Sequence, residues 1–176
     1  MEAGGSALGR HSRLKMRAAS AAMQIRIDDL RGPAIADLLR THLEFCRAAS
    51  PPESTHALDL DGLRAPVVTF WSAWDGPNLI GCGALKELDP AHGEIKSMHT
   101  AAGHRGRGVG VAILKHIVAE ARARGLRRLS LETGSMAAFA PARALYAGFG
   151  FTECAPFDTY KPDPNSVFMS LDLAKR

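Results

Sequence analysis

The sequence predicts a mixed β-sheet covered by helices, of class α/β or α+β. Segments that alternate apolar and polar residues occur in runs joined by short turns, which is typical of antiparallel hairpins. Similar segments also flank long helical segments, which is typical of strand–helix–strand units with parallel pairing. The length of 176 residues fits one domain with a full hydrophobic core.

The first half of the chain contains one expected helix and four expected strands. Gly32-Pro33 opens the helix and Ser50-Pro51-Pro52 ends it, because proline fits the first helical turn and interrupts later ones. The apolar residues between them recur at nearly 3.6-residue spacing. A polar connection follows as far as Asp61-Gly62. The strands are expected at residues 23–27, 67–71, 79–85 and 94–100.

The second half begins with the clearest helix, expected from Val109 to about Arg124. Its buried stripe is expected to consist of Leu114, Ile117, Val118 and Ala121, and Gly125 caps its end. A second helix is expected over residues 138–147. Strands are expected at residues 126–132, near 150–154 and at 167–173.

The positive charge is concentrated at the beginning of the chain. Of the formal net charge of +4, residues 1–22 contribute +3. These residues are rich in Gly, Ala, Ser and Arg, so we expect a disordered basic tail before a domain at residues 23–176. A leader, an early start codon and a transit peptide all fit the tail. The remaining residues carry only +1, which argues against a nucleic-acid partner.

Other classes of protein are excluded by what the sequence contains. The three cysteines are far apart, which argues against a disulfide framework and favours a reducing compartment, the cytoplasm. The seven histidines form no zinc motif, so we expect no metal. No apolar run approaches the roughly 18 residues of a membrane span, so we expect no membrane partner.

A glycine-rich loop between the fourth strand and the long helix carries the main functional signal. It reads Arg105-Gly106-Arg107-Gly108-Val109-Gly110. Glycines let the backbone turn sharply and approach a ligand, and a helix start presents free N–H groups that favour an anion. The loop matches neither a P-loop nor a dinucleotide fingerprint. From the residues alone it is therefore either a phosphate site or a flexible turn without a ligand.

Two motifs of the chain resemble the GNAT acetyltransferases. The family signature is Gln or Arg, two residues, Gly, one residue, and Gly or Ala, and Arg105, Gly108 and Gly110 match it. A downstream helix of the pattern A-x-x-L-Y-x-x-x-G-F is matched by Ala142, Leu145, Tyr146, Gly150 and Phe151. The resemblance extends from Met23 to Leu173. Segments 96–98, 130–136 and 163–169 are similar to a bacterial subgroup.

The resemblance implies the GNAT fold and its substrate, acetyl-CoA. The fold is a mixed, mostly antiparallel sheet of about six to seven strands flanked by about four helices, with splayed fourth and fifth strands. The family's pyrophosphate site would fall on Arg105, Gly106, Arg107, Gly108, Val109, Gly110 and Val111, and its pantetheine site on Met98, His99 and Thr100. Phe139 stands where many members have an asparagine that contacts pantetheine.

The resemblance also implies transfer of an acetyl group to an amine, which requires a proton donor and a proton acceptor. Tyr146 aligns with the family's general acid, although helical spacing alone favours a packing role. For the base, Glu94 lies where several members carry a catalytic glutamate. Glu132, His99 and a water chain to bulk solvent are alternatives.

Substrate residues are expected in the variable early segments. His56, Asp59 and Trp71 are candidates to bind a cationic amine and to wall the cleft, although a solvated loop and a core tryptophan explain them equally well. The partner is then the amine of a small molecule or peptide, and a homodimer is one assembly that the sequence allows. A non-catalytic acyl-CoA sensor on the same scaffold is the rival interpretation, and a nucleic-acid-associated protein recruited by its basic tail is a third.

Overall fold

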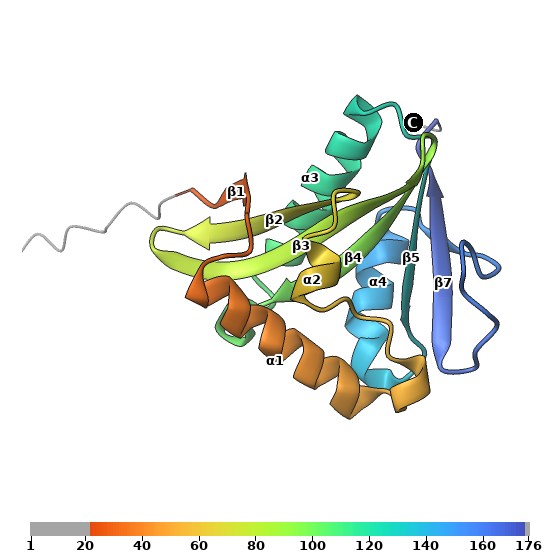
Figure 1. Cartoon of the computed structure of the whole chain (residues 1–176), viewed down its shortest axis with the longest axis horizontal. Coiled ribbons are helices and arrows are strands. Elements are labelled where there is room, and N and C mark those ends of the chain that lie inside the picture. The colour runs from red at the N-terminus through yellow and green to blue at the C-terminus, as the bar shows by residue number, and fades with distance from the viewer. Residues whose placement is uncertain (1–21, 175–176) are drawn as a thin grey trace, which may run out of the picture.

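The computed structural model describes residues 22–174 and contains one seven-stranded sheet in the order β1-β2-β3-β4-β5-β7-β6 (Figure 1). The strands are β1 (Gln24–Ile27), β2 (Val68–Asp75), β3 (Asn78–Asp89), β4 (His92–Thr100), β5 (Arg128–Gly134), β6 (Thr152–Glu153) and β7 (Ser166–Asp172). The helices are α1 (Pro33–Ala49), α2 (Leu60–Leu63), α3 (Val109–Ala123) and α4 (Ala140–Gly148). Three 3₁₀ turns are η1 (Pro52–Ser54), η2 (Ala102–His104) and η3 (Ala137–Phe139).

Strands β4 and β5 pair over only part of their length. All neighbouring strands are antiparallel except this pair, which is parallel. Its pairing runs from His92↔Arg128 to Glu94↔Ser130. Beyond these residues the strands separate, and Figure 1 shows β4 and β5 diverging. The edge of β4 from Ile95 to Thr100 therefore faces a gap and leaves backbone groups available to a ligand.

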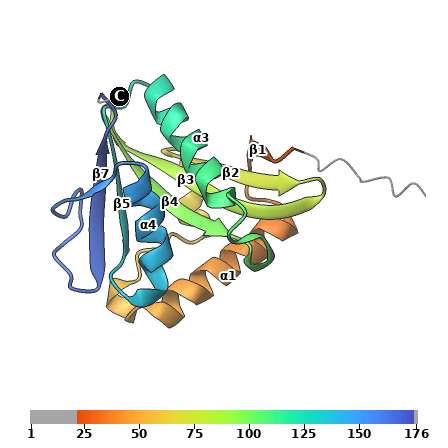
Figure 2. The same ribbon diagram turned by 180° about the vertical axis from the view of Figure 1, so that it is seen from behind.

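The helices cover both faces of the sheet. Figure 1 shows α1 and α2 in front of it, and the opposite view in Figure 2 shows α3 and α4. The α1 face packs Ile35 and Leu39 of α1 against Phe70 of β2. The other face packs Ile113 and Ile117 of α3 into a larger cluster that includes residues of β2 to β5. Each strand contributes alternate residues to the two faces, as its pleat requires.

A β-bulge in β4 lies along the gap, beyond the last residue that pairs with β5. The register between β3 and β4 shifts between Cys82 and Ala84, and Ser97 on β4 has a φ of +52°. Gly83 lies opposite this bulge. A Cβ at Gly83 would lie 2.7 Å from the Met98 sulfur. The glycine inside this strand therefore gives Met98 and α3 room to pack closely on the sheet.

The predicted fold class is confirmed, including the separated fourth and fifth strands and the mostly antiparallel sheet. The connection expected to be a loop contains the short helix α2, because Asp59 accepts a hydrogen bond from the Gly62 N–H at 2.9 Å and caps it. The expectation for residues 1–22 falls almost entirely outside the described residues. Between residues 22 and 174 no helix has the length and hydropathy that crossing a membrane requires.

Candidate active site

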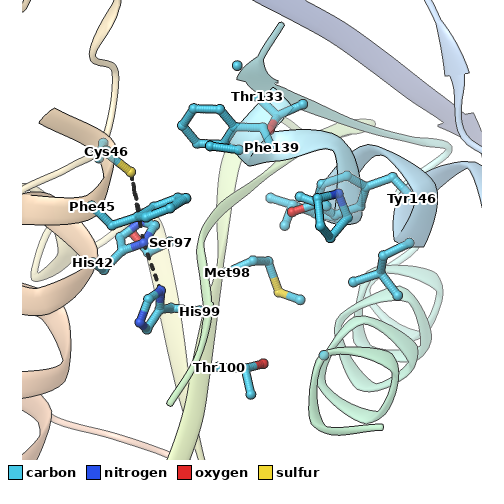
Figure 3. Close-up of a pocket in the computed structure, with 18 of the residues that line it drawn as sticks. His42, Phe45, Cys46, Ser97, Met98, His99, Thr100, Thr133, Phe139 and Tyr146 are labelled. Atoms are coloured by element: carbon cyan, nitrogen blue, oxygen red, sulfur yellow. Dashed lines mark hydrogen bonds between the residues drawn. The ribbon is translucent and has the colours of Figure 1, made fainter. Parts of the chain in front are cut away.

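A cavity of about 540 Å³ passes through the gap between β4 and β5 (Figure 3). It is lined from one face of the sheet by the glycine-rich loop, the start of α3 and helix α4. From the other face it is lined by α1 and by residues 54–57. Cavities of this volume hold small-molecule ligands. Two ligands that enter from opposite faces of the sheet can therefore meet between the two strands.

The glycine-rich loop has a backbone conformation that few side chains tolerate. Gly106 and Gly108 have φ values of +72° and +80°, and a Cβ at either would meet no atom within 4 Å. Gly108 caps α3 without a side-chain hydrogen bond, and the first helical N–H group to bond back is that of Ala112. The first-turn amides of Val109, Gly110 and Val111 therefore have no intrahelical acceptor. Open space beside free N–H groups fits a diphosphate.

The structure brings most of the predicted cofactor residues together. The cavity lining contains Met98, His99, Thr100, Arg105, Gly106, Gly108, Val109, Gly110 and Val111. Arg107 is exposed and does not contribute to the lining. The free edge of β4 and the start of α3 thus form two adjoining walls.

Tyr146 of α4 lines the cavity on the face of the sheet that α3 covers (Figure 3). It is 6% exposed and packs edge-on against Phe151. Its hydroxyl has no hydrogen-bond partner among the described residues. Burial raises the pKa of this phenol, so the hydroxyl stays protonated at neutral pH. It is a hydrogen-bond donor that faces the cavity.

Glu94 lies outside the cavity, in a buried polar cluster. Its side chain is 1% exposed, and one carboxylate oxygen accepts hydrogen bonds from Lys96 Nζ at 3.1 Å and from Tyr160 Oη at 2.6 Å. Lys96 also donates to Tyr160 Oη at 2.8 Å and to the His56 carbonyl at 3.1 Å. Glu94 therefore holds the buried Lys96 in place. A base that faces the substrate is expected to line the cavity, and Glu94 does not line it.

Glu132 of β5 is the carboxylate that lines the cavity. Burial raises its pKa, and the hydrogen bond that Ser166 Oγ donates at 2.7 Å, together with the charge of Lys96, lowers it in part. A carboxylate with a raised pKa is a stronger proton acceptor than an exposed one.

The part of the cavity on the α1 face, which we call the acceptor side, is formed mainly by aromatic and imidazole rings. The Nδ1 atoms of His42 and His99 lie 3.3 Å apart, and Cys46 Sγ lies 3.8 Å from His42 Nε2 (Figure 3). The acceptor side is lined by residues that include His42, Phe45, Cys46, His56, Lys96, His99, Glu132 and Phe139. Within residues 22–174, no group of three or more His, Cys, Asp or Glu side chains is arranged to hold a metal ion.

The imidazoles of His42 and His99 are neutral at physiological pH. Burial, with His99 and Lys96 nearby, lowers the pKa of His42 to about 4. Burial and Arg105 lower the pKa of His99 to about 4. A hydrogen bond between two Nδ1 atoms also requires that only one of them carries a hydrogen.

The neutral histidine pair predicts acid sensitivity of the fold. Below pH 6.5 the unfolded chain takes up protons at both histidines, whereas the folded chain does so only near pH 4. The free energy of unfolding should therefore fall as the pH falls from 6.5 to 4. Urea unfolding at several pH values measures this slope, which should become shallower in a His42→Asn/His99→Asn variant. His92, whose pKa burial also lowers, supplies part of the remaining slope. An equally steep slope in the double variant would contradict the assignment.

The three predicted substrate residues lie in different places. His56 lines the cavity. Asp59 caps α2 and does not line it. The expectation that Trp71 walls the cleft is wrong, because this residue is 2% exposed in the core under α3, where it packs edge-on against His116. The alternation of β2 places Trp71 on the face opposite the acceptor side.

The sequence interpretation missed Phe45, Cys46 and the partnership of His42 with His99. A signal was present, because residues 42, 45 and 46 are spaced i, i+3 and i+4 and therefore share one face of a helix. The expected apolar stripe of this helix included His42, and Phe45 and Cys46 were given no role. The position of this face over the gap depends on tertiary structure.

Comparison with known proteins decides the family. Residues 34–151 match the family model "Acetyltransferase (GNAT) family". The chain belongs to the GNAT acetyltransferases. It is 59% identical over 151 residues to the uncharacterized N-acetyltransferase YsnE of Bacillus subtilis, covering 86% of this chain and all of the relative. It is 41% identical to the IAA acetyltransferase of Azospirillum brasilense, covering 80% of this chain and 91% of that protein.

Solved structures agree with this assignment of the fold. A Klebsiella pneumoniae protein, whose name assigns it to the acyl-CoA N-acyltransferases, has a TM-score of 0.73 and 29% identity, covering 86% of this chain and 98% of its own. A GNAT acetyltransferase of Elizabethkingia anophelis with acetyl-CoA bound has a TM-score of 0.62 and 18% identity, covering 85% and 97%. The family match and the N-acetyltransferase relatives show that this chain is an acyltransferase enzyme, and acetyl-CoA is the donor that its family implies.

Proposed function

We propose that this GNAT acetyltransferase transfers the acetyl group of acetyl-CoA to a primary amine of a small molecule or peptide, by direct attack in a ternary complex. One observation carries the proposal. The cavity crosses the sheet through the β4–β5 gap, with the glycine-rich loop on one face and the acceptor side on the other. A donor and an acceptor that enter from opposite faces can be bound at the same time, which direct attack requires.

Backbone groups would form most of the site for the donor, acetyl-CoA. The amides at the start of α3 and the turns at Gly106 and Gly108 would hold the diphosphate of acetyl-CoA, with Arg105 beside it. The free edge of β4 at Met98, His99 and Thr100 would bind the pantetheine arm through backbone hydrogen bonds. A backbone N–H at this edge would also stabilise negative charge that develops on the carbonyl oxygen.

The proton transfers follow from two side chains. The bound donor supplies a thioester, whose carbon–sulfur bond breaks as the carbon–nitrogen bond forms. The acceptor nitrogen must lose a proton and the sulfur must gain one. Glu132, with its raised pKa, would accept the first, and the protonated Tyr146 would donate a hydrogen bond and then a proton to the sulfur. Glu94 would act as a positioning residue through Lys96.

The direct test combines binding and turnover. At about 100 times its dissociation constant, acetyl-CoA should add ~2.7 kcal/mol to the free energy of unfolding, which thermal melting detects. A panel of primary amines, with free thiol as the readout, should then show amine-dependent release of CoA. IAA, the compound in the name of the Azospirillum relative, is tested separately from the amine panel, with the same readout. Binding without release by any acceptor would contradict the proposed reaction.

Glu132 gives a pH-dependent prediction. Because the pKa of Glu132 is raised, this base should become protonated at a higher pH than an ordinary glutamate. As the pH decreases, kcat/KM should therefore begin to fall at a pH above the usual glutamate pKa. Glu132→Gln should lower kcat by about 10²-fold or more and abolish this acid limb. Ser166→Ala should shift the limb to higher pH, because Ser166 lowers the pKa of Glu132. A Glu132→Gln variant with an unchanged profile would place the base elsewhere.

We also propose a cytoplasmic location and a homodimer. A cytoplasmic location is supported by the three cysteines, which are free in the structure. A homodimer stays a prediction that the oligomeric state in solution would decide.

A further inference from the structure

Two aromatic rings from different elements, α1 and η3, meet on the acceptor side. Phe45 of α1 and Phe139 of η3 pack edge-to-face, with ring centroids 5.3 Å apart and an interplanar angle of 65°. Both line the cavity, where Figure 3 shows Phe45 beside His42 and Phe139 near Thr133. Neither is fully buried, so both keep apolar surface available to a ligand.

The sheet is shaped to admit the Phe139 ring. A Cβ at Gly134, the last residue of β5, would collide with this ring. The glycine therefore allows Phe139 to lie against the end of β5 and reach Phe45. Arg143 fixes the same turn, because it donates hydrogen bonds to the carbonyls of Gly134 and Met136. The aromatic pair is thus supported by two further elements of the chain.

The charges around the pair favour an uncharged ligand body. His42 and His99 are neutral, and burial raises the pKa of the Cys46 thiol to about 11, so that it is neutral too. Lys96 uses its three hydrogens on Glu94, Tyr160 and the His56 carbonyl. It therefore has no free donor for a carboxylate. Glu132 has no salt-bridge partner within the described residues, so it is available to an amine and repels an acidic group.

We propose that the acceptor is a primary amine on an apolar, aromatic body without an acidic group, and that Phe45 and Phe139 determine this specificity. The amine lies toward Glu132 and the aromatic body against the two phenylalanines. This inference rests on the proposed acetyl transfer, because it names the acceptor of that reaction. Burial of one aromatic ring is sufficient for at least about tenfold discrimination.

Three probe amines separate the contributions of the ring and the charge. 2-Phenylethylamine carries the ring alone, L-phenylalanine adds a carboxylate, and ethylamine lacks the ring. We expect kcat/KM for 2-phenylethylamine to exceed both others at least about tenfold. Preference for ethylamine or L-phenylalanine would overturn the inference and leave the proposed acetyl transfer intact.

Variants connect the specificity to the aromatic pair. Phe139→Ala and Phe45→Ala should each lower the ratio of kcat/KM for 2-phenylethylamine to that for ethylamine about tenfold, and Gly134→Ala should do the same because it displaces the Phe139 ring. Phe157→Ala is the matched control. Phe157 is a half-buried phenylalanine that packs against Tyr160 outside the cavity. The Phe157→Ala variant should therefore keep the ratio of kcat/KM of the unaltered enzyme. An unchanged ratio in the first three variants would overturn the inference.

A binding measurement distinguishes failure of this inference from failure of the proposed function. Calorimetry with protein saturated with CoA should show 2-phenylethylamine binding that Phe139→Ala weakens. If that binding occurs and no amine is acetylated, the specificity stands and the proposed reaction fails. If the amine does not bind and other amines are acetylated, the reaction stands and the specificity fails.

Discussion

Replacing Tyr146 by Phe should lower kcat by about 10²- to 10⁴-fold and leave acetyl-CoA affinity nearly unchanged. The hydroxyl has no hydrogen-bond partner within residues 22–174 and lines the cavity, so its removal costs the fold little. Because burial raises the pKa of this phenol, the hydroxyl is protonated at neutral pH and can act as the proton donor of the proposed reaction. Thiol release with an acetylated amine as product measures kcat, and calorimetry measures the affinity.

The second tyrosine of the chain provides the matched control. Tyr160 donates to Glu94 and accepts from Lys96, away from the cavity. Tyr160→Phe should therefore lower the free energy of unfolding by about 1–3 kcal/mol, since it leaves buried charged groups short of a partner. Its loss of kcat should be much smaller than that of Tyr146→Phe. Equal kcat losses in the two variants would show that Tyr146 acts only through packing.

Replacing Gly108 by Val should weaken acetyl-CoA binding by at least about tenfold, the equivalent of ~1.4 kcal/mol. The valine side chain would enter the open space beside the first-turn amides of α3. It would also adopt a positive φ, which costs roughly 1–2 kcal/mol of stability for a residue with a Cβ. Calorimetric titration with acetyl-CoA measures the affinity.

A Gly125→Val variant, at the other end of α3, distinguishes the loss of acetyl-CoA binding from the effect of backbone strain. Its φ is +79°, against +80° at Gly108, and a Cβ there likewise meets nothing within 4 Å. Gly125→Val should therefore lose similar stability and keep its affinity for acetyl-CoA. Equal affinities in both valine variants would contradict a role for the Gly108 turn in binding.

The residues of the glycine-rich loop that line the cavity could be predicted from the sequence better than those of the acceptor side. Arg105 to Gly110 are consecutive, so their local pattern specifies both the turn and the free helix start. The acceptor side combines α1, β4, β5 and η3, and its contacts join residues 57 positions apart, as in His42 and His99. Such a site depends on how far β4 and β5 separate, which no local pattern encodes.

The positions of two glutamates also could not be predicted from local sequence. Glu94 is the last residue of β4 that pairs with β5, Glu132 lies two residues past the last paired residue of β5, and the sequence favoured Glu94. Only the structure shows that Glu94 is committed to Lys96 and Tyr160, whereas Glu132 lines the cavity. Trp71 was misplaced for a related reason, since the face that a strand residue occupies depends on the register of the whole sheet.

A crystal structure of the chain grown with acetyl-CoA tests the proposed donor site most directly. The diphosphate should lie against the N–H groups between Gly106 and Val111, with the thioester between β4 and β5 and within reach of Tyr146. Acetyl-CoA bound on another surface, with the amides of this loop hydrogen-bonded only to solvent, would contradict the proposed site.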